Sequence, residues 1–326
     1  MTWSGFVPTP ENRSAWLAVR QLAAGLRSAK PRPTVPSLFL HGPTGTGKTH
    51  LVNALTNDLR QHAPNRVALL FSAGELSRVA RQKPETWTLA ADADLLAVED
   101  LQHLTGSAAQ TLAFVFDQRL SEQRPMVFTA NVGPRQLKSV PTRLVSRLAG
   151  GLVIGLAPLG PESRNLILRR EAKLRRLAVD DDVLAWLAKE LTGSGRYLRG
   201  VIARLVGISR NRKGTLRLED VQRQLGEEIQ ASRPTVERIA QRVGQHFHVG
   251  VRQLQSRRRT RHILLPRQIG MYLARQLTSL SLSEIGDWFG GRDHTTVLSA
   301  CRRVESSLRT NPELASAVES LQAEFR

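Results

Sequence analysis

The first half of the chain alternates between two patterns of apolar residues. Short runs that are almost continuously apolar, bounded by turn residues, are typical of strands buried on both faces. Five such runs are Ser37–His41, Val67–Phe71, Leu95–Val98, Met126–Thr129 and Gly151–Gly155. Segments with helical spacing lie between them, for instance Thr49–Arg60 and Ala108–Leu120. The alternation predicts an α/β fold in which a five-stranded parallel sheet is joined by right-handed crossovers.

After Pro158 the spacing of apolar residues is helical only. The expected helices are Pro161–Leu177, Asp180–Leu191, Gly195–Ile208 and Leu218–Ile229. The segments from Thr235 onward are helical as well, and Pro266 is expected to begin one of their helices. We therefore expect three parts. They are an α/β part over residues 1–157, an α-helical lid with a connector helix over 158–230, and an all-α domain over 235–326, with a joint at 231–234.

Near the end of the chain, two helical patterns flank a pair of glycines. Ser281 and Glu284 have the spacing of a capping box at the start of the first helix. The second helix has apolar residues at helical spacing: Val297, Ala300, Cys301 and Val304. Its first turn is polar and consists of Asp293, His294, Thr295 and Thr296. The pattern predicts a helix-turn-helix, in which this turn would read base edges in the major groove. Taken alone, Asp293 and His294 also fit an ordinary helix cap beside a surface histidine.

Composition points to a polyanionic partner. Lys and Arg number 47 against 28 Asp and Glu, a net charge of +19. Such a charge favours nucleic acid first and acidic lipid surfaces second, and the alternative is a basic surface that only serves solubility. The single cysteine, Cys301, excludes an intrachain disulfide. Neither a membrane-spanning run nor an export signal is evident in the sequence, so we expect a cytoplasmic protein.

The segment GPTGTGKTH satisfies the phosphate-loop pattern G-x-x-x-x-G-K-[ST] between a predicted strand and a predicted helix. In such a loop, backbone N–H groups surround the phosphates. Lys48 is expected to reach the terminal phosphates, and the hydroxyl of Thr49 to bind Mg²⁺. The predicted nucleotide-binding residues are Gly42, Pro43, Thr44, Gly45, Thr46, Gly47, Lys48, Thr49 and His50.

Polar residues at the ends of other elements are candidates for the same site. Glu99 and Asp100 end an apolar strand, where Glu99 could hold Mg²⁺ and Asp100 could orient the attacking water. Asn131 follows another strand and could sense the γ-phosphate, or it is a turn residue. Arg147 and Arg196 are candidates for cations that stabilise the transferred phosphate, although each alone reads as a surface arginine.

The segment EIGDWFGGRDHTTVLSACRRVE, with GGRDHTTV at Gly290–Val297 as its most specific part, resembles the DNA-binding signature of the DnaA family of bacterial chromosomal replication initiators. The resemblance extends over nearly everything from Phe6 onward. It implies base contacts by Asp293–Thr296 to the short origin repeats called DnaA boxes. It also implies a minor-groove contact by Arg259 and phosphate contacts by Arg267 and Arg275.

The same resemblance implies an ATPase of the AAA+ superfamily with ATP or ADP and Mg²⁺ as ligands. Arg147 matches the arginine finger that reaches the ATP of a neighbouring subunit, and Arg196 matches the second sensor. ATP-bound protomers of the family assemble on boxes and melt the adjacent AT-rich duplex, and slow hydrolysis switches them off. The expected location is the cytoplasm, at the nucleoid, with acidic phospholipids as further candidate partners.

Three departures from the family pattern bear on function. The chain starts near the ATPase, without the usual N-terminal interaction domain that helps to recruit the replicative helicase. Glu99 stands where Asp is usual, and Asn131 where Asp is common. These departures affect the residues and segments expected to serve hydrolysis, melting and helicase loading. They leave the motifs for binding boxes and ATP intact. A divergent paralogue that regulates without melting an origin is the alternative. A helicase-loader or transposition-helper ATPase would share the phosphate loop but not Asp293–Val297.

Overall fold

The computed structural model describes residues 1–28, 35–83, 85–104, 106–137, 139–210, 214–232, 234–258, 260–278 and 280–325. The chain forms two compact units, Met1–Arg217 and Leu218–Arg326. The boundary falls before the last helix of the region predicted as lid and connector, 158–230. The division into three functional parts stays a prediction.

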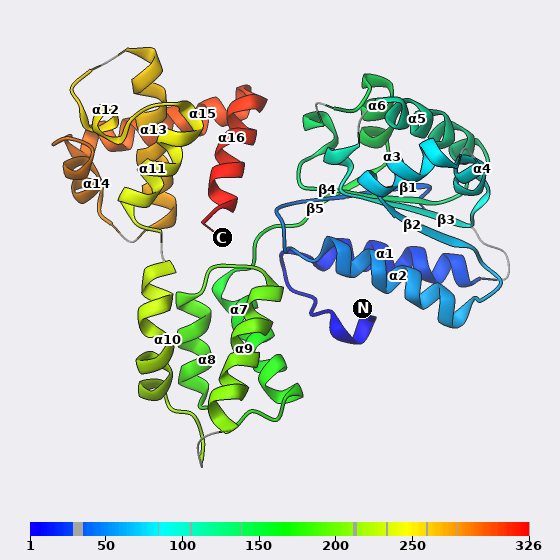
Figure 1. Cartoon of the computed structure of the whole chain (residues 1–326), viewed down its shortest axis with the longest axis horizontal. Coiled ribbons are helices and arrows are strands. Elements are labelled where there is room, and N and C mark those ends of the chain that lie inside the picture. The colour runs from blue at the N-terminus through cyan, green and yellow to red at the C-terminus, as the bar shows by residue number, and fades with distance from the viewer. Residues whose placement is uncertain are drawn as a thin grey trace. The chain divides into compact units, whose positions relative to one another are not determined.

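The first unit is built on a parallel sheet with strand order β2-β3-β4-β1-β5 (Figure 1). Its strands are β1 (Ser37–His41), β2 (Ala68–Ser72), β3 (Leu95–Glu99), β4 (Met126–Ala130) and β5 (Leu152–Gly155). The predicted strands are thereby confirmed, with ends that differ by at most one residue. Because β3, β4 and β1 are neighbours, the residues that follow them meet at one edge of the sheet. Those residues are Asp100, Asn131 and the phosphate loop.

Helices cover both faces of this sheet. Figure 1 shows α1 (Arg13–Arg27) and α2 (Lys48–His62) on one face and, on the other, α3 (Ala73–Gln82), α4 (Glu85–Asp92), α5 (Gly106–Ser121) and α6 (Thr142–Gly150). Successive strand residues point to opposite sides, so that Leu38 and Leu40 pack with α1 and α2 while Phe39 packs into the other core. Burial on both faces explains why the strand sequences are almost entirely apolar.

Short 3₁₀ helices complete the connections at η1 (Trp3–Gly5), η2 (Leu101–His103) and η3 (Pro134–Gln136). The lid helices are α7 (Pro161–Leu174), α8 (Asp181–Glu190) and α9 (Gly195–Arg210). The first of them stops before its predicted end at Leu177, because Arg176 adopts a left-handed conformation with φ 51°. The N–H of Leu177 then donates to the carbonyl of Ala172 and closes the helix end.

The second unit is all-α (Figure 1). Its helices are α10 (Leu218–Ser232), α11 (Val236–Phe247), α12 (Val251–Gln255), α13 (Arg261–Leu277), α14 (Leu282–Trp288), α15 (His294–Thr310) and α16 (Pro312–Ala323). The predicted capping box of α14 is confirmed, because Ser281 Oγ accepts from the Glu284 N–H and Ser281 N–H donates to Glu284 Oε2. The predicted inner face of α15 is buried as well: Val297, Ala300, Cys301 and Val304.

One expected helix start is wrong. The sequence pattern placed Pro266 at the beginning of a helix, but α13 begins at Arg261 and Pro266 lies inside it. The N–H groups of Ile263 and Leu264 both donate to the carbonyl of Thr260, so the first turn is already formed. The proline removes only the bond to the carbonyl of His262, an exposed residue of that first turn, and a helix tolerates such a loss near its start. Within the described residues, none of the helices combines the length and hydropathy needed to cross a bilayer.

Candidate functional site

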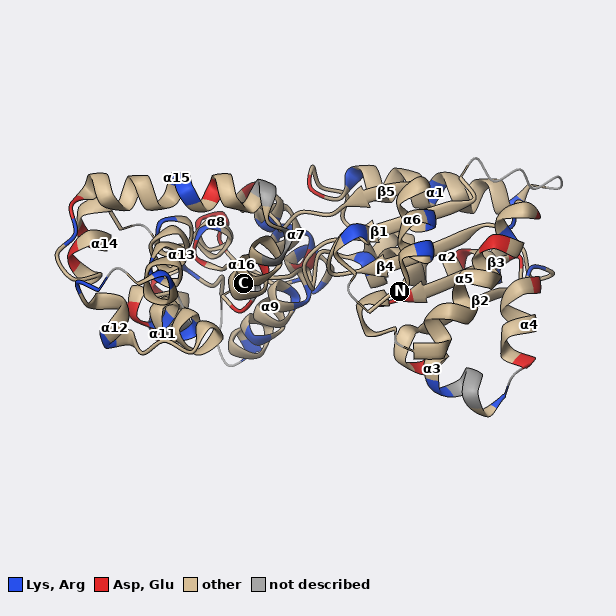
Figure 2. Cartoon of the chain, turned by 90° about the horizontal axis from the view of Figure 1, so that it is seen from above, with Lys and Arg blue, Asp and Glu red and all other residues tan. Residues whose placement is uncertain are grey.

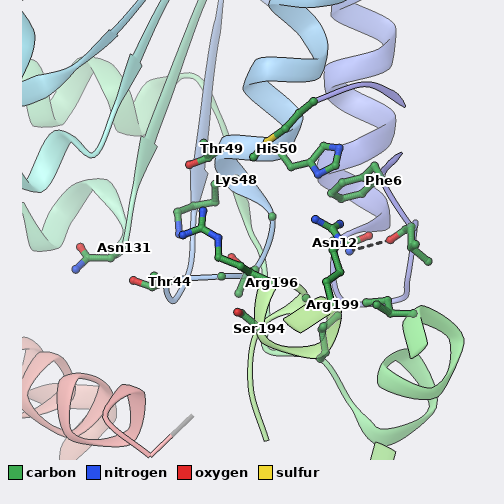
Figure 3. Close-up of a pocket in the computed structure, with 18 of the residues that line it drawn as sticks. Phe6, Asn12, Thr44, Lys48, Thr49, His50, Asn131, Ser194, Arg196 and Arg199 are labelled. Carbon is green, nitrogen blue, oxygen red and sulfur yellow. Dashed lines mark hydrogen bonds between the residues drawn. The ribbon is translucent and has the colours of Figure 1, made fainter. Parts of the chain in front are cut away.

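A pocket of about 410 Å³ opens at the carboxyl edge of the sheet (Figure 3). Residues 44–50 of the phosphate loop line it on one side. Asp100, Gln102 and Asn131 line it from the strand ends, and Arg196 and Arg199 from α9 of the lid. The structure thus brings the predicted phosphate loop, an acid, Asn131 and a lid arginine to one cavity.

The phosphate loop places a buried cation at the start of α2. Lys48 is the first residue of this helix, and its side chain is almost fully buried. Its Nζ donates to the carbonyls of Gly42 at 2.5 Å and Pro43 at 3.0 Å. Burial lowers the pKa of Lys48, and the nearby Asp100 and Glu99 carboxylates oppose that change. Together with the free N–H groups at the start of α2, this ammonium makes the pocket attractive for an anion.

The lid touches the phosphate loop at Gly45. A Cβ on Gly45 would lie 2.1 Å from the Cβ of Ser194, and the residue has a φ of +86°. Both the contact and the left-handed backbone therefore require glycine. The motif identified Gly45 from the sequence, but Ser194, which lies 149 positions later by subtraction of the residue numbers, carried no local signal.

The two strand-end acids differ in environment. Asp100 adopts a left-handed conformation with φ 57°, which is unfavourable for a residue with a Cβ. Its N–H donates to Thr129 Oγ1, and its Oδ1 accepts a bond from Gln102 Nε2 at 3.1 Å. Gln102 Oε1 in turn accepts the N–H of Asn131. Gln102 thus connects two of the predicted residues, and sequence reasoning did not find it.

Glu99 is suited to a metal ion. Burial raises the pKa of its carboxyl group, and the hydroxyl of Thr49 counteracts this by hydrogen bonding. Its Oε1 is buried without a hydrogen-bond partner among the described residues. A carboxylate oxygen and a threonine hydroxyl beside a phosphate site are ligands that Mg²⁺ accepts, so the residues present fit the ion.

The two predicted arginines lie in different places. Arg196 is exposed at the start of α9, and Figure 3 shows it extending toward the phosphate loop. Arg199, one turn later, also lines the pocket, and its Nε donates to Glu171 Oε1 at 3.1 Å. Arg147 lies on α6, outside the pocket lining, and its Nε is 2.9 Å from Asp117 Oδ1. Arg196 and Arg199 are three residues apart and so share one helix face, and this spacing could have identified Arg199 from the sequence.

The segment before α1 also contributes to the pocket. The ring of Phe6 meets His50 edge-on at a centroid distance of 5.3 Å, and both residues line the cavity. Arg170 Nη1 donates to the carbonyl of Phe6, and Asn12 Nδ2 donates to that of Val7. The segment is thereby held against both α2 and the lid. Phe6 lies in a segment without helical or strand periodicity, so the sequence gave no signal for this role.

In the second unit, the predicted base-reading residues begin α15. Asp293 is its N-cap, and its carbonyl accepts the N–H groups of Thr296 and Val297. The side chains of Asp293, His294, Thr295 and Thr296 are exposed, whereas Val297 is buried. Arginines, blue in Figure 2, recur on α11, α12 and α15. This leading end of α15 is free to enter a groove of nucleic acid.

The three arginines predicted to contact DNA differ from one another. Arg275 is exposed, and its Nη1 donates to the carbonyl of Leu280 at 3.3 Å. Arg267 is only 3% exposed, and its guanidinium bonds to backbone carbonyls. A phosphate would reach it only if those bonds broke. Arg259 lies outside the described residues.

The parallel sheet with its phosphate loop, the helical lid and the helix-turn-helix define an AAA+ nucleotide-binding fold with an all-α DNA-binding-type domain. Two family models match the chain: the bacterial DnaA ATPase domain over residues 1–155 and the bacterial DnaA helix-turn-helix over residues 236–304. The chain belongs to the DnaA family of chromosomal replication initiator proteins.

Relatives and a solved structure agree with this assignment. The chain is 36% identical over 340 residues to the chromosomal replication initiator protein DnaA of Rhodopseudomonas palustris strain TIE-1, covering 100% of this chain and 72% of the relative. It is 34% identical to that of Zymomonas mobilis, covering 88% of this chain but 62% of the relative's length. The structure of AMPPCP-bound DnaA from Aquifex aeolicus is similar with a TM-score of 0.62 and 25% identity, covering 99% of this chain and 96% of that one.

Proposed function

We propose that the chain is an ATP-dependent replication initiator that binds DnaA boxes in duplex DNA, oligomerises in the ATP state and promotes origin opening. Slow ATP hydrolysis serves as its off-switch. The observation that carries the proposal is the convergence of the phosphate loop with Arg196 and Arg199 of the lid on one pocket. A nucleotide bound there would contact both the sheet and the lid, so its γ-phosphate could set the lid's position.

The chemistry of the pocket supports ATP with Mg²⁺ as the ligand. Lys48 would exchange its carbonyl partners for phosphate oxygens, and Phe6 with His50 offers an apolar surface for the base. Thr49 and Glu99 would hold the ion, which would neutralise phosphate charge when bound. The relative from Aquifex aeolicus carries AMPPCP, an ATP analogue.

The strand-end residues support slow hydrolysis. Asp100 is held by Thr129 and Gln102 in a strained backbone conformation at the edge of the pocket, where it could orient a water molecule. Asn131 is linked to it through Gln102 and could report on the γ-phosphate. The family resemblance implies slow turnover, and a neutral amide at this position adds no positive charge to stabilise the transferred phosphate.

Exposure of Asp293–Thr296 at the start of α15 supports base reading, and the net charge of +19 supports attraction to DNA. The exposed position of Arg147 outside its own pocket is compatible with a finger that acts on a neighbouring subunit. The same charge favours acidic phospholipids as a further partner and a location at the nucleoid.

Footprinting on an array of DnaA boxes beside an AT-rich tract tests the proposal, with ATP, ADP or no nucleotide. We expect protection of single boxes in each state, extended protection with ATP, and permanganate-reactive thymines in the AT-rich tract with ATP only. Protection without unpaired thymines would favour the regulator that does not melt DNA. Equal binding to boxes and scrambled duplex would contradict both.

A further inference from the structure

Arg267 is hydrogen-bonded to the segment Gln253–Arg258, which consists of the end of α12 and the residues that follow it. Its Nε donates to the carbonyl of Leu254 at 2.5 Å, and its Nη1 to that of Arg258 at 2.8 Å. Its Nη2 donates to the carbonyls of Gln253 at 3.1 Å and Ser256 at 2.7 Å. One planar guanidinium therefore holds four carbonyls of one short segment, which a lysine could not do.

The same segment is fastened to the turn of the helix-turn-helix. Arg292 Nη2 donates to the carbonyl of Ser256 at 2.8 Å, and Gln255 Nε2 donates to that of Trp288 at 3.1 Å. At Gly290, which has a φ of +94°, a Cβ would lie 1.9 Å from the carbonyl oxygen of Gln255. The two pieces of backbone are thus in direct contact, with Arg292 only two residues before His294.

Arginine side chains lie on both the exposed and the buried side of this segment. Arg257 and Arg258 are exposed, whereas Arg267 is buried and bonds to backbone carbonyls of the described residues. Burial lowers the pKa of Arg267, and the neighbouring Arg292 guanidinium lowers it further. Positive groups gathered in this way are stabilised when a polyanion lies on the outer surface.

We propose that Arg267 is a positioning residue for DNA binding: it holds the segment 253–258 against the turn, so that Arg257, Arg258 and the leading end of α15 meet the duplex as one rigid surface. The inference rests on the proposed function, and it differs from the direct phosphate contact that the family resemblance implies. A direct contact needs a free guanidinium, and this one is committed to the backbone.

The substitution Arg267→Lys separates the two roles. Lysine keeps the charge and can still neutralise a phosphate, but one ammonium cannot hold four carbonyls. In the 326-residue chain without DNA, we expect trypsin to cleave after Arg257 and Arg258 roughly 10-fold faster in this variant. The reason is that losing a charge-assisted hydrogen bond shifts an opening equilibrium by about that factor. Arg242→Lys is the control: this arginine is exposed on α11 and lies outside the segment.

The DNA readout uses labelled duplexes that carry a DnaA box or its scrambled sequence. We expect Arg267→Lys to weaken box binding roughly 10- to 100-fold and to reduce the preference for the box, since base reading depends on register. The control should match the parent chain in both affinity and cleavage. Circular dichroism melts show whether the second unit remains folded.

Unchanged cleavage together with parental box affinity in Arg267→Lys would overturn the inference, because charge alone would then suffice. If that variant does not fold, Arg292→Gln provides the test, since Arg292 is only half-buried and makes the bond to Ser256. Faster cleavage of the segment together with weaker box binding in this variant supports the proposal. Cleavage and box affinity equal to those of the parent chain contradict it. If the parent chain itself does not prefer the box over scrambled duplex, the proposed function is contradicted. The cleavage measurement is made without DNA, so it tests the role of Arg267 independently of that outcome.

Discussion

Arg147 forms an ion pair with Asp117 on the surface of the first unit, with Nε 2.9 Å from Oδ1. The other carboxylate oxygen of Asp117 accepts Arg143 Nη2 at 2.5 Å, and the guanidinium of Arg143 lies over the ring of Phe114. That ring is 64% exposed. The residue predicted to act as an arginine finger therefore belongs to an exposed cluster with an aromatic surface, away from its own nucleotide pocket.

Arg147→Ala should leave ATP binding by the isolated protomer within about two-fold of the parent, because Arg147 lies outside the pocket. Its ion pair is half-exposed, so the free energy of unfolding should fall by less than ~1 kcal/mol. We expect ATP-dependent assembly, measured by light scattering after size exclusion, to be lost. Arg169→Ala is the control, since Arg169 is similarly exposed and pairs with Asp181. Loss of ATP binding by the monomer would refute the finger assignment.

Glu99→Gln should stabilise the protein near neutral pH. Burial raises the pKa of Glu99 in the fold, so its ionised form is less favourable there than in the unfolded chain. The parent therefore loses stability as the pH rises from the ordinary glutamate pKa of 4.5 through the raised one, and the advantage of the glutamine variant should shrink as the pH falls back toward 4.5. Melting temperatures across this range provide the measurement, and Mg²⁺-dependent ATP binding should weaken.

Glu75→Gln is the control of opposite sign. Hydrogen bonds from the N–H and hydroxyl of Ser72 lower the pKa of Glu75 in the fold. The ionised carboxylate therefore stabilises the fold at pH values above the pKa of the unfolded chain, and this stabilisation is lost as the pH falls through the pKa of the folded chain. The variant should therefore be less stable than the parent near neutral pH. Two variants with the same pH trend would contradict the assignment of these environments.

His294→Ala and Thr295→Ala should each cost ~1–3 kcal/mol of binding free energy at a DnaA box and little on random duplex. Both side chains are exposed at the start of α15, so the fold should be unaffected. Fluorescence anisotropy with box and scrambled duplexes at fixed salt measures the difference. His246→Ala, at an exposed position on α11, should match the parent. A uniform loss on both duplexes would indicate phosphate contacts in place of base reading.

Arg119→Met should destabilise the first unit by about 3 kcal/mol or more. Arg119 is fully buried, its pKa is lowered by burial to about 10, and its guanidinium holds several carbonyls. They belong to Ala90, Ala91, Ala93 and Pro125. Without it these carbonyls would be buried and unpaired. Urea unfolding measures the loss, and Arg124→Met, at a partly exposed neighbour, should cost much less. Equal effects would mean that the carbonyls find other partners.

Much of the first unit could be predicted because its signals are local. Strands such as Leu95–Glu99 are buried on both faces, and only a continuous apolar run satisfies that. The phosphate loop is a contiguous segment whose backbone makes the site. Pro266 misled the prediction of a helix start because a proline is tolerated both at the first position and slightly later in the first turns.

The sequence by itself determined the strands, the phosphate loop, the strand-end acids and the capped pair of helices α14 and α15. Tertiary structure alone decided that Phe6, Gln102 and Ser194 belong to the nucleotide pocket, and that Arg147 pairs with Asp117 outside it. It likewise decided that Arg267 holds a loop. The reason is physical: a backbone pattern repeats within a few residues, whereas the role of a glutamine or an arginine depends on which distant carbonyl or carboxylate the packed chain brings within hydrogen-bonding distance.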